Sequence, residues 1–126
     1  MPSRFVILHH RLDAGEHWDL MLEQGDVLLT WQLLREPMNR ESLPIPARRI
    51  GDHRKAYLDY EGPLTRNRGT VHRVDFGSMN MVEITPECCR LVLSGQRLRG
   101  SFTLQKDGDE WLLVGSGARS PASPKQ

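Results

Sequence analysis

The side chains best suited to metal chemistry lie in a short stretch near the N-terminus. His10, His17 and Asp19 offer two imidazoles and one carboxylate there. Side chains alternate between the two faces of an extended strand, so His17, Asp19 and Met21 would share one face. The apolar residues between them would face the other way. Two imidazoles and a carboxylate leave coordination positions open, as a metal needs if it is to activate water or hold a phosphate oxygen.

The segments around these residues predict a β-hairpin. Residues 4–8 form a β-prone run, and residues 13–15 are Asp-Ala-Gly, which favours a turn. If the flanking runs pair as antiparallel strands, His10 comes to lie near His17, because opposed residues have their β-carbons about 5 Å apart. The competing interpretation is that these are ordinary surface residues of a hairpin. His9 is the alternative to His10 as the ligand, but alternation places it on the opposite face, and we favour His10.

A second group of candidates lies in residues 47–60, the most basic part of the chain. His53 and Tyr57 could bracket a phosphate, because a protonated imidazole can neutralise its charge or protonate a leaving group, and a phenol can donate a hydrogen bond. Arg49 adds a guanidinium that can donate two hydrogen bonds. The competing interpretation is a solvated surface that happens to be basic. Four further arginines could track a phosphate backbone, although a solvated surface is the preferred interpretation for them. They are Arg66, Arg68, Arg97 and Arg99.

Composition bounds the class of protein. The chain has 126 residues, of which 38% are hydrophobic and 26% charged, with a net charge of +1. This length favours one domain, and the small net charge excludes a strong global attraction to nucleic acid or to an anionic membrane. Cys88 and Cys89 are adjacent, a spacing that rarely closes a disulfide, which indicates a reducing compartment. The sequence has no apolar run of membrane-span length and no leader pattern, so we expect a cytoplasmic monomer that does not associate with a membrane.

Short β-prone segments separated by turns predict the fold. After the opening hairpin, the expected strands are residues 27–33, 70–76, 79–84, 89–93, 101–105 and 110–114. Residues 35–46 hold three prolines and predict a loop with at most a short helical turn. The pattern predicts a mainly β, single-domain antiparallel β-barrel with little helix over residues 1–114, and a disordered tail over residues 115–126. Its expected core includes Trp18, Leu20, Leu22, Trp31 and Trp111.

Laid out in this order, the motifs resemble a known family. The sequence is similar to the 3′-phosphoesterase domain found at the N-terminus of bacterial DNA ligase D and as small stand-alone proteins. The resemblance covers nearly all of the expected ordered part, and the order and combination of its motifs are specific. The matching segments are residues 4–10, 17–23, 30–31, 49–57, 59–62, 69–71, 91–100 and 111–113.

The resemblance implies a β-barrel with its active site on an outer, polar surface and a divalent metal, typically manganese, with zinc as the alternative from the ligand set. It implies removal of a 3′-terminal ribonucleotide and of a 3′-phosphate from DNA or DNA/RNA ends in DNA repair, with a ligase or polymerase acting in trans. The residues that match the family's metal ligands are His10, His17 and Asp19. Those that match its phosphate-contacting and catalytic side chains are His53, Tyr57 and Arg49.

One departure from the family pattern motivates a second hypothesis. The family usually places an arginine two residues after the metal-binding aspartate, and here that position is Met21. Methionine neither carries charge nor donates a hydrogen bond. The alternative function is therefore a catalytically weak or inactive module of the same fold that binds nucleic acid or phosphate. A third class, a metal hydrolase of small phosphorylated metabolites, is compatible with the modest net charge.

Overall fold

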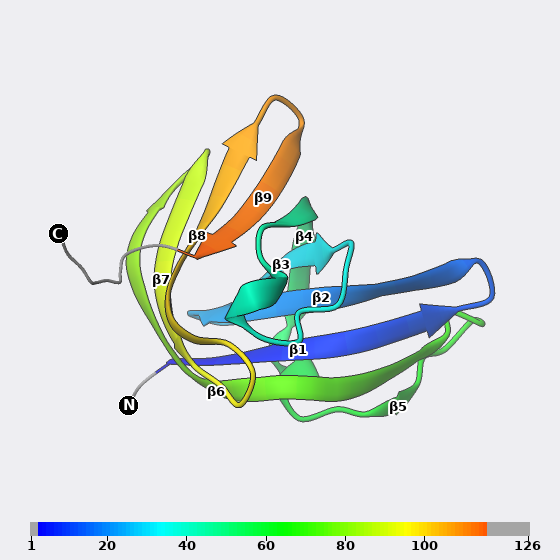
Figure 1. The fold of residues 1–126 in the computed structure, drawn as a ribbon. Helices are drawn as coiled ribbons and strands as arrows, with labels where there is room; N and C mark the ends of the chain where they lie inside the picture. Colours follow the sequence, from blue (N-terminus) through cyan, green and yellow to red (C-terminus); the bar gives the residue numbers. More distant parts are fainter. Residues whose placement is uncertain (1–2, 116–126) are drawn as a thin grey trace, which may run out of the picture.

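Nine strands and two short 3-10 turns make up the part of the chain that the computed structural model describes, residues 3–115 (Figure 1). The strands are β1 (Ser3–Leu12), β2 (Gly15–Gln24), β3 (Val27–Leu33), β4 (Ile45–Arg54), β5 (Gly62–Pro63), β6 (Thr70–Thr85), β7 (Cys88–Ser94), β8 (Arg99–Asp107) and β9 (Glu110–Gly115). The turns are η1 (Arg40–Ser42) and η2 (Lys55–Leu58).

Eight of the strands close into an antiparallel barrel. They are hydrogen-bonded in the order β1-β2-β3-β4-β9-β8-β7-β6, and a further pairing of β6 with β1 completes the circle, while β5 extends the sheet beyond β6. Closure is possible because β6 is long: its first part pairs with β1 and its second part with β7. The predicted antiparallel β-barrel with little helix is confirmed.

The strand boundaries differ from the sequence prediction in β4 and in β6. No strand was predicted over β4, which begins at Ile45 and so inside the expected loop of residues 35–46. Residues 70–76 and 79–84 were expected to be separate strands, but β6 continues through Gly77. A β-carbon at Gly77 would lie 2.1 Å from the backbone oxygen of Ser94. The glycine therefore allows β6 and β7 to approach closely where β6 changes partner, and it does not break the strand.

Apolar residues form two cores, one inside the barrel and one on its outer surface. The inner core includes Trp18, Leu20, Leu22, Trp31 and Trp111, so the core prediction is confirmed. Full burial of a large apolar side chain stabilises the fold by about 1.5 to 3 kcal/mol. The outer core lies on the opposite face of β1, β2 and β3 and beneath η2. It consists of Val6, Leu8, Met21, Leu28, Leu58 and Val71, with Tyr57 and Leu64 packed against it.

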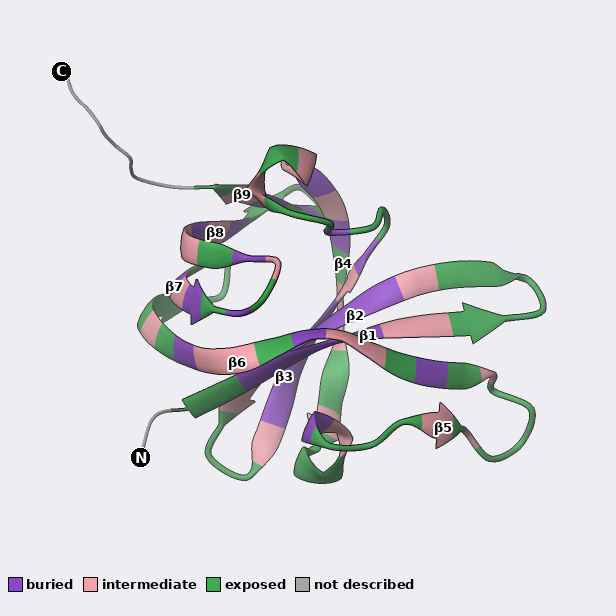
Figure 2. Cartoon of the chain, turned by 60° about the horizontal axis from the view of Figure 1, so that its bottom comes forward, coloured by how far each residue is buried: buried purple, intermediate pink, exposed green. Residues whose placement is uncertain are grey.

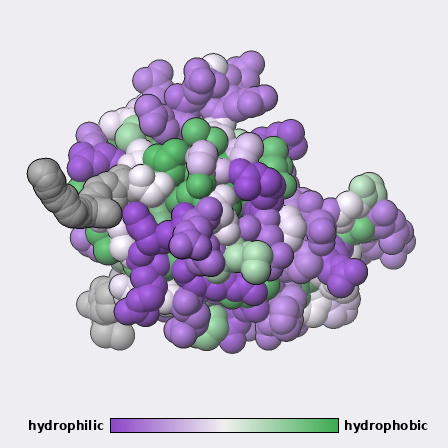
Figure 3. Space-filling view, in the orientation of Figure 1, coloured by the Kyte–Doolittle hydropathy of each residue, from purple (hydrophilic) through white to green (hydrophobic). Residues whose placement is uncertain are grey.

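The β1–β2 hairpin and the start of β6 extend to one side of the barrel (Figure 1). Burial is greatest in the middle of β1 and β2, and the end of the hairpin is exposed (Figure 2). Hydrophilic side chains cover most of this projecting part in the view of Figure 3. The polar candidates thus lie where the buried part of the hairpin gives way to its exposed end.

Three further expectations concern the ends and chemistry of the chain. Gly115 still belongs to β9, and residues 116–126, which cover the rest of the expected tail, lie outside the described residues. Cys88 and Cys89 are free cysteines. None of the helical turns within residues 3–115 is long and apolar enough to cross a membrane.

Candidate metal centre

His10, His17 and Asp19 come together through the pairing of β1 with β2. His10 is directly opposite His17, and Leu8 is opposite Asp19, so all three polar side chains share the outer face. One ligand atom from each lies within 4.8 Å of the others. His10 Nδ1 is 3.0 Å from His17 Nε2 and 3.5 Å from an oxygen of Asp19, and His17 Nε2 is 3.2 Å from the other oxygen.

The backbone fixes which nitrogen of His10 is available to an ion. His10 Nε2 is 2.7 Å from the carbonyl oxygen of Arg68. A carbonyl oxygen only accepts, so Nε2 carries the proton, and Nδ1 of the neutral ring presents a lone pair to the cluster. This arrangement, in which one ring nitrogen faces the ion and the other donates to an oxygen, is the usual support of a histidine ligand.

The buried carboxylate also fits a cation. Asp19 is only 3% exposed, and its Oδ1 accepts no hydrogen bond in the described structure. A buried carboxylate oxygen that accepts no hydrogen bond is costly, whereas a divalent ion between the carboxylate and the two imidazoles beside it would satisfy all three groups. The donor set therefore suits a metal that prefers nitrogen and oxygen ligands, which includes both manganese and zinc.

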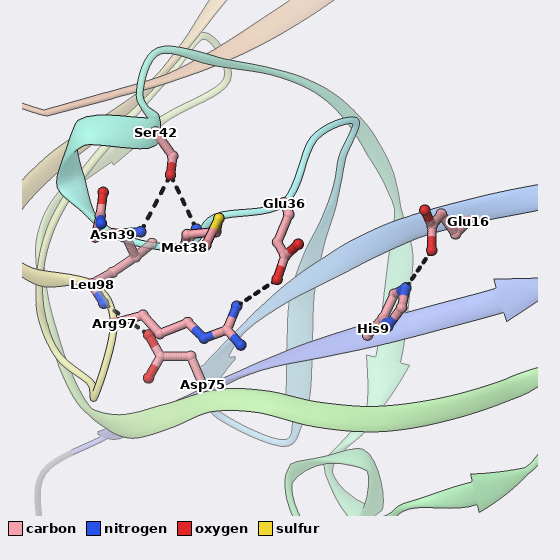
Figure 4. Close-up of polar contacts among 9 residues, drawn as sticks. All are labelled: His9, Glu16, Glu36, Met38, Asn39, Ser42, Asp75, Arg97 and Leu98. Atoms are coloured by element: carbon pink, nitrogen blue, oxygen red, sulfur yellow. Dashed lines mark hydrogen bonds and ion pairs between the residues drawn. The ribbon is translucent and has the colours of Figure 1, made fainter.

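His9 lies outside this cluster. Its ring stacks on Trp18 at a centroid distance of 4.8 Å and an angle of 5°, and its Nε2 is 2.7 Å from a carboxylate oxygen of Glu16 (Figure 4). These contacts are on the face opposite to His10. Of the two adjacent histidines, His10 is the one that the structure brings to His17 and Asp19.

A pocket of about 90 Å³ opens beside the cluster and joins it to the middle of the chain. His10, Asp19, Met21, His53 and Tyr57 all line it. A bulge in the pairing of β3 with β4 places His53 opposite Leu28, on the outer face. His53 Nδ1 donates to the carbonyl of Gly51 at 3.0 Å, which leaves Nε2 for other contacts, and the His53 and Tyr57 rings meet edge to face at 5.6 Å.

Two ion pairs hold η2, and with it Tyr57, against the barrel. Lys55 Nζ is 2.7 Å from a carboxylate oxygen of Glu23, and Arg4 pairs with Asp59 at 2.7 Å. The hydrogen bond from Lys55 holds the pKa of Glu23 below its ordinary value, and the one from Arg4 lowers the pKa of Asp59. The same pairing raises the pKa of Arg4. Both carboxylates therefore stay ionised into mildly acidic solution.

Arg49 lies apart from the other predicted residues. It is opposite Trp31 in the β3–β4 pairing, and its guanidinium carbon is 4.4 Å from the centre of that ring. Trp31 belongs to the inner core, so Arg49 is on the inner side of the sheet, and it does not line the pocket that His53 and Tyr57 share. The structure thus brings together five of the six predicted site residues.

Two polar residues at the site were not predicted to belong to it. Gln32 is opposite Asp19 in the β2–β3 pairing, with its side-chain nitrogen 3.4 Å from His17 Nε2. Pairing the residues before the Gly25 turn with those after it would have placed Gln32 opposite Asp19, on the outward face of β3. Arg68 lines the pocket and holds His10 through its carbonyl, although the sequence favoured a solvated surface role. A backbone contact of this kind leaves no sequence signal.

Comparison with protein families finds a match. The sequence profile described as the DNA Ligase D 3′-phosphoesterase domain matches residues 8–106 of the 126-residue chain. The matched segment contains the cluster, the pocket beside it and every candidate residue described above. No curated protein sequence matches the chain.

Proposed function

The chain belongs to the DNA ligase D 3′-phosphoesterase domain family, and from that premise we propose that it is a metal-dependent phosphoesterase of nucleic acid ends. Its substrates would be DNA or DNA/RNA 3′ ends that carry a terminal ribonucleotide or a phosphate. The observation that carries the proposal is the convergence of His10, His17 and Asp19 beside one pocket. Two of these residues, His10 and Asp19, line that pocket together with His53 and Tyr57.

The ligand set His10 Nδ1, His17 Nε2 and Asp19 would hold the ion, for which we propose manganese, with zinc as the alternative. When bound, such an ion supplies Lewis-acid polarisation of the phosphate and a lower pKa for water. Gln32 supports His17 from the neighbouring strand, and the Arg68 carbonyl keeps the His10 ring in the tautomer that the cluster needs.

The pocket residues would act on the phosphate itself. Tyr57 can donate its hydroxyl hydrogen to a phosphate oxygen, and His53, with Nδ1 engaged by Gly51, has Nε2 for the leaving oxygen. Hydrolysis forms a bond from the oxygen of a water molecule to phosphorus and breaks the bond between phosphorus and the leaving oxygen. The water gives up a proton to solvent, and an imidazolium at His53 would supply the proton that the leaving group requires. We assign the cationic phosphate contact to Arg68, which lines the pocket, rather than to Arg49, which lies over Trp31.

The test is turnover of primer–templates that end in one ribonucleotide or in a 3′-phosphate, with manganese present and after its removal by a chelator. Wild-type protein should process both ends only with the metal. His17→Ala should reduce the rate at least 100-fold, in line with the loss of a residue that orients charge at the reacting centre. Absence of wild-type turnover, or full turnover by His17→Ala, would reject the proposal.

The second candidate is a binding module that does not catalyse, and Met21 is the observation that favours it. Met21 lies in the outer core and is 1% exposed. Its thioether side chain carries no charge that could bind a phosphate. An inert wild type that binds 3′-phosphorylated DNA, and that gains hydrolysis on Met21→Arg, would favour this function. A partner ligase or polymerase would then act on the bound end in trans.

A further inference from the structure

A second pocket adjoins the one at the metal centre and shares a wall with it. Its volume is about 240 Å³, and Tyr57, Leu64 and Arg68 line both pockets. The remaining lining residues come from the end of β4, from η2 and from the segment around β5. They are Arg54, Ala56, Tyr60, Pro63 and Thr65. In Figure 2 the helical turn that precedes β5 and β5 itself lie along the same side of the barrel.

Aromatic rings lead from the metal centre into this second pocket. His53 meets Tyr57 edge to face, and Tyr57 meets Tyr60 at a centroid distance of 6.1 Å and an angle of 90°. The Tyr60 hydroxyl donates to the backbone oxygen of Pro63, which holds the ring in place. A ring that is already fixed loses little conformational freedom when a planar group stacks on it.

The charge of the pocket suits an anionic polymer. Arg54 and Arg68 line it, and none of the described lining residues is acidic. Thr65 accepts hydrogen bonds from Arg68 Nε and Nη2 at 3.0 and 3.2 Å, which fixes that side chain between the two pockets. The volume lies below the roughly 300 to 1,000 Å³ of pockets for drug-sized ligands, so it suits a single nucleoside.

We propose that the second pocket binds the base of the nucleoside whose 3′ oxygen carries the phosphate at the metal centre. This proposal rests on the proposed function. It gives the position of the last nucleoside that stays on the nucleic acid after the reaction. This nucleoside is present both in a 3′-phosphate end and in an end with a terminal ribonucleotide. Because the two pockets share a wall, one can hold the base of a nucleotide while the other holds the phosphate that is bonded to the same sugar. Aromatic stacking would accept any base, because every base has a π-face.

The experiment measures the affinity of the full chain for fluorescent single-stranded oligonucleotides that end in a 3′-phosphate, with a chelator present so that no turnover occurs. In one oligonucleotide the last nucleotide is intact, and in the other it lacks its base. The wild type should bind the intact end more tightly. Tyr60→Ala should lose about 10-fold in affinity for the intact end, since stacking on one ring contributes on the order of that factor. It should leave affinity for the abasic end unchanged.

Two further variants separate stacking from general damage. Tyr60→Phe keeps the ring and should retain the preference for the intact end. Leu112→Ala is the matched control, because Leu112 is as exposed as Tyr60, at 37%, and lies on β9, away from the pocket. Equal wild-type affinity for the two ends, equal loss on both with Tyr60→Ala, or no binding of either end would overturn the proposal. Failure of turnover with manganese, with the base preference intact, would instead count against the proposed function alone.

Discussion

The chemistry of the site depends on which side chains of β2 lie on its outer face. Asp19 and Met21 are neighbours on the outer face, yet Asp19 is a buried carboxylate in the cluster that could hold a metal ion, and Met21 is an apolar residue in the outer core. The outer face of β2 therefore changes from apolar at Met21 to polar at Asp19, only two residues away. Met21 therefore gives the wall of the 90 Å³ pocket an uncharged side chain that donates no hydrogen bond.

Met21→Arg should strengthen binding of a phosphate and weaken the fold. The new guanidinium would start from the wall of the 90 Å³ pocket, beside His53 and Tyr57. We expect about 10-fold tighter binding of a 3′-phosphorylated oligonucleotide and a loss of about 1 to 3 kcal/mol in the free energy of unfolding, as for other overpacked sites. Binding titration and chemical denaturation measure the two effects.

Met21→Leu is the control for this substitution. It conserves volume and should change stability by less than about 1.5 kcal/mol, with no change in phosphate affinity. If Met21→Arg and Met21→Leu bind the oligonucleotide equally well, then Met21 does not face the phosphate.

Among the elements of the site, η2 is attached to the barrel largely by ion pairs. It has one buried residue, Leu58, and the pairs of Lys55 with Glu23 and of Arg4 with Asp59 hold it and the residue after it. Tyr57 depends on this attachment for its position beside both pockets. The stability of η2 should therefore be linked to the ionisation of the two carboxylates.

Acid should weaken this attachment through Glu23. Its pKa is lowered in the folded protein by the hydrogen bond from Lys55, so the stabilisation is fully present above the unfolded value, about 4.5, and is lost as the pH falls through the folded value. Glu23→Gln should cost about 0.5 to 1 kcal/mol at pH 7 and show a shallower loss of stability below pH 4.5 than the wild type. Urea denaturation across this pH range measures both. Parallel curves for the two proteins would show that Glu23 is not linked to folding.

Sequence patterns predicted the elements with local signals and missed those set by long-range pairing. Residues 27–33 are β3 as predicted, and the Asp-Ala-Gly turn placed His10 opposite His17. The β3–β4 bulge and the continuation of β6 through Gly77 depend on contacts with strands far away in the sequence. For the same reason sequence alone gave no means of telling that Arg49 faces Trp31, or that the Arg68 carbonyl meets His10.

At the scale of the whole molecule, a buried carboxylate on β6 holds one end of the barrel together. Asp75 is 0% exposed, and its side chain accepts hydrogen bonds from three backbone N–H groups. These are Phe76 at 2.9 Å, Gln96 at 2.6 Å and Leu98 at 2.9 Å (Figure 4 shows the contact with Leu98). Two of the donors belong to the β7–β8 connection, so the carboxylate fixes that loop to β6.

Asp75→Ala should destabilise the whole barrel. It leaves the buried N–H of Leu98 and the partly buried N–H of Gln96 without their acceptor, and a buried donor left unsatisfied costs about 1 to 3 kcal/mol. We expect a total loss of at least about 3 kcal/mol in the free energy of unfolding, and a smaller loss for Asp75→Asn, which keeps one acceptor oxygen. Chemical denaturation followed by tryptophan fluorescence measures the losses. A change of less than about 1 kcal/mol for Asp75→Ala would contradict this role.

The outer-face cluster on β1 and β2 is the proposed reaction centre, and substitution of the two adjacent histidines separates it from the rest of the hairpin. The measurement is kcat/KM with manganese for a primer–template that ends in a ribonucleotide, for wild type, His9→Ala and His10→Ala. His10→Ala should lose at least 100-fold, while His9→Ala, which removes only the contacts with Trp18 and Glu16, should stay within about threefold of wild type. Equal losses in the two variants, or a larger loss in His9→Ala, would show that the outer-face cluster is not the reaction centre.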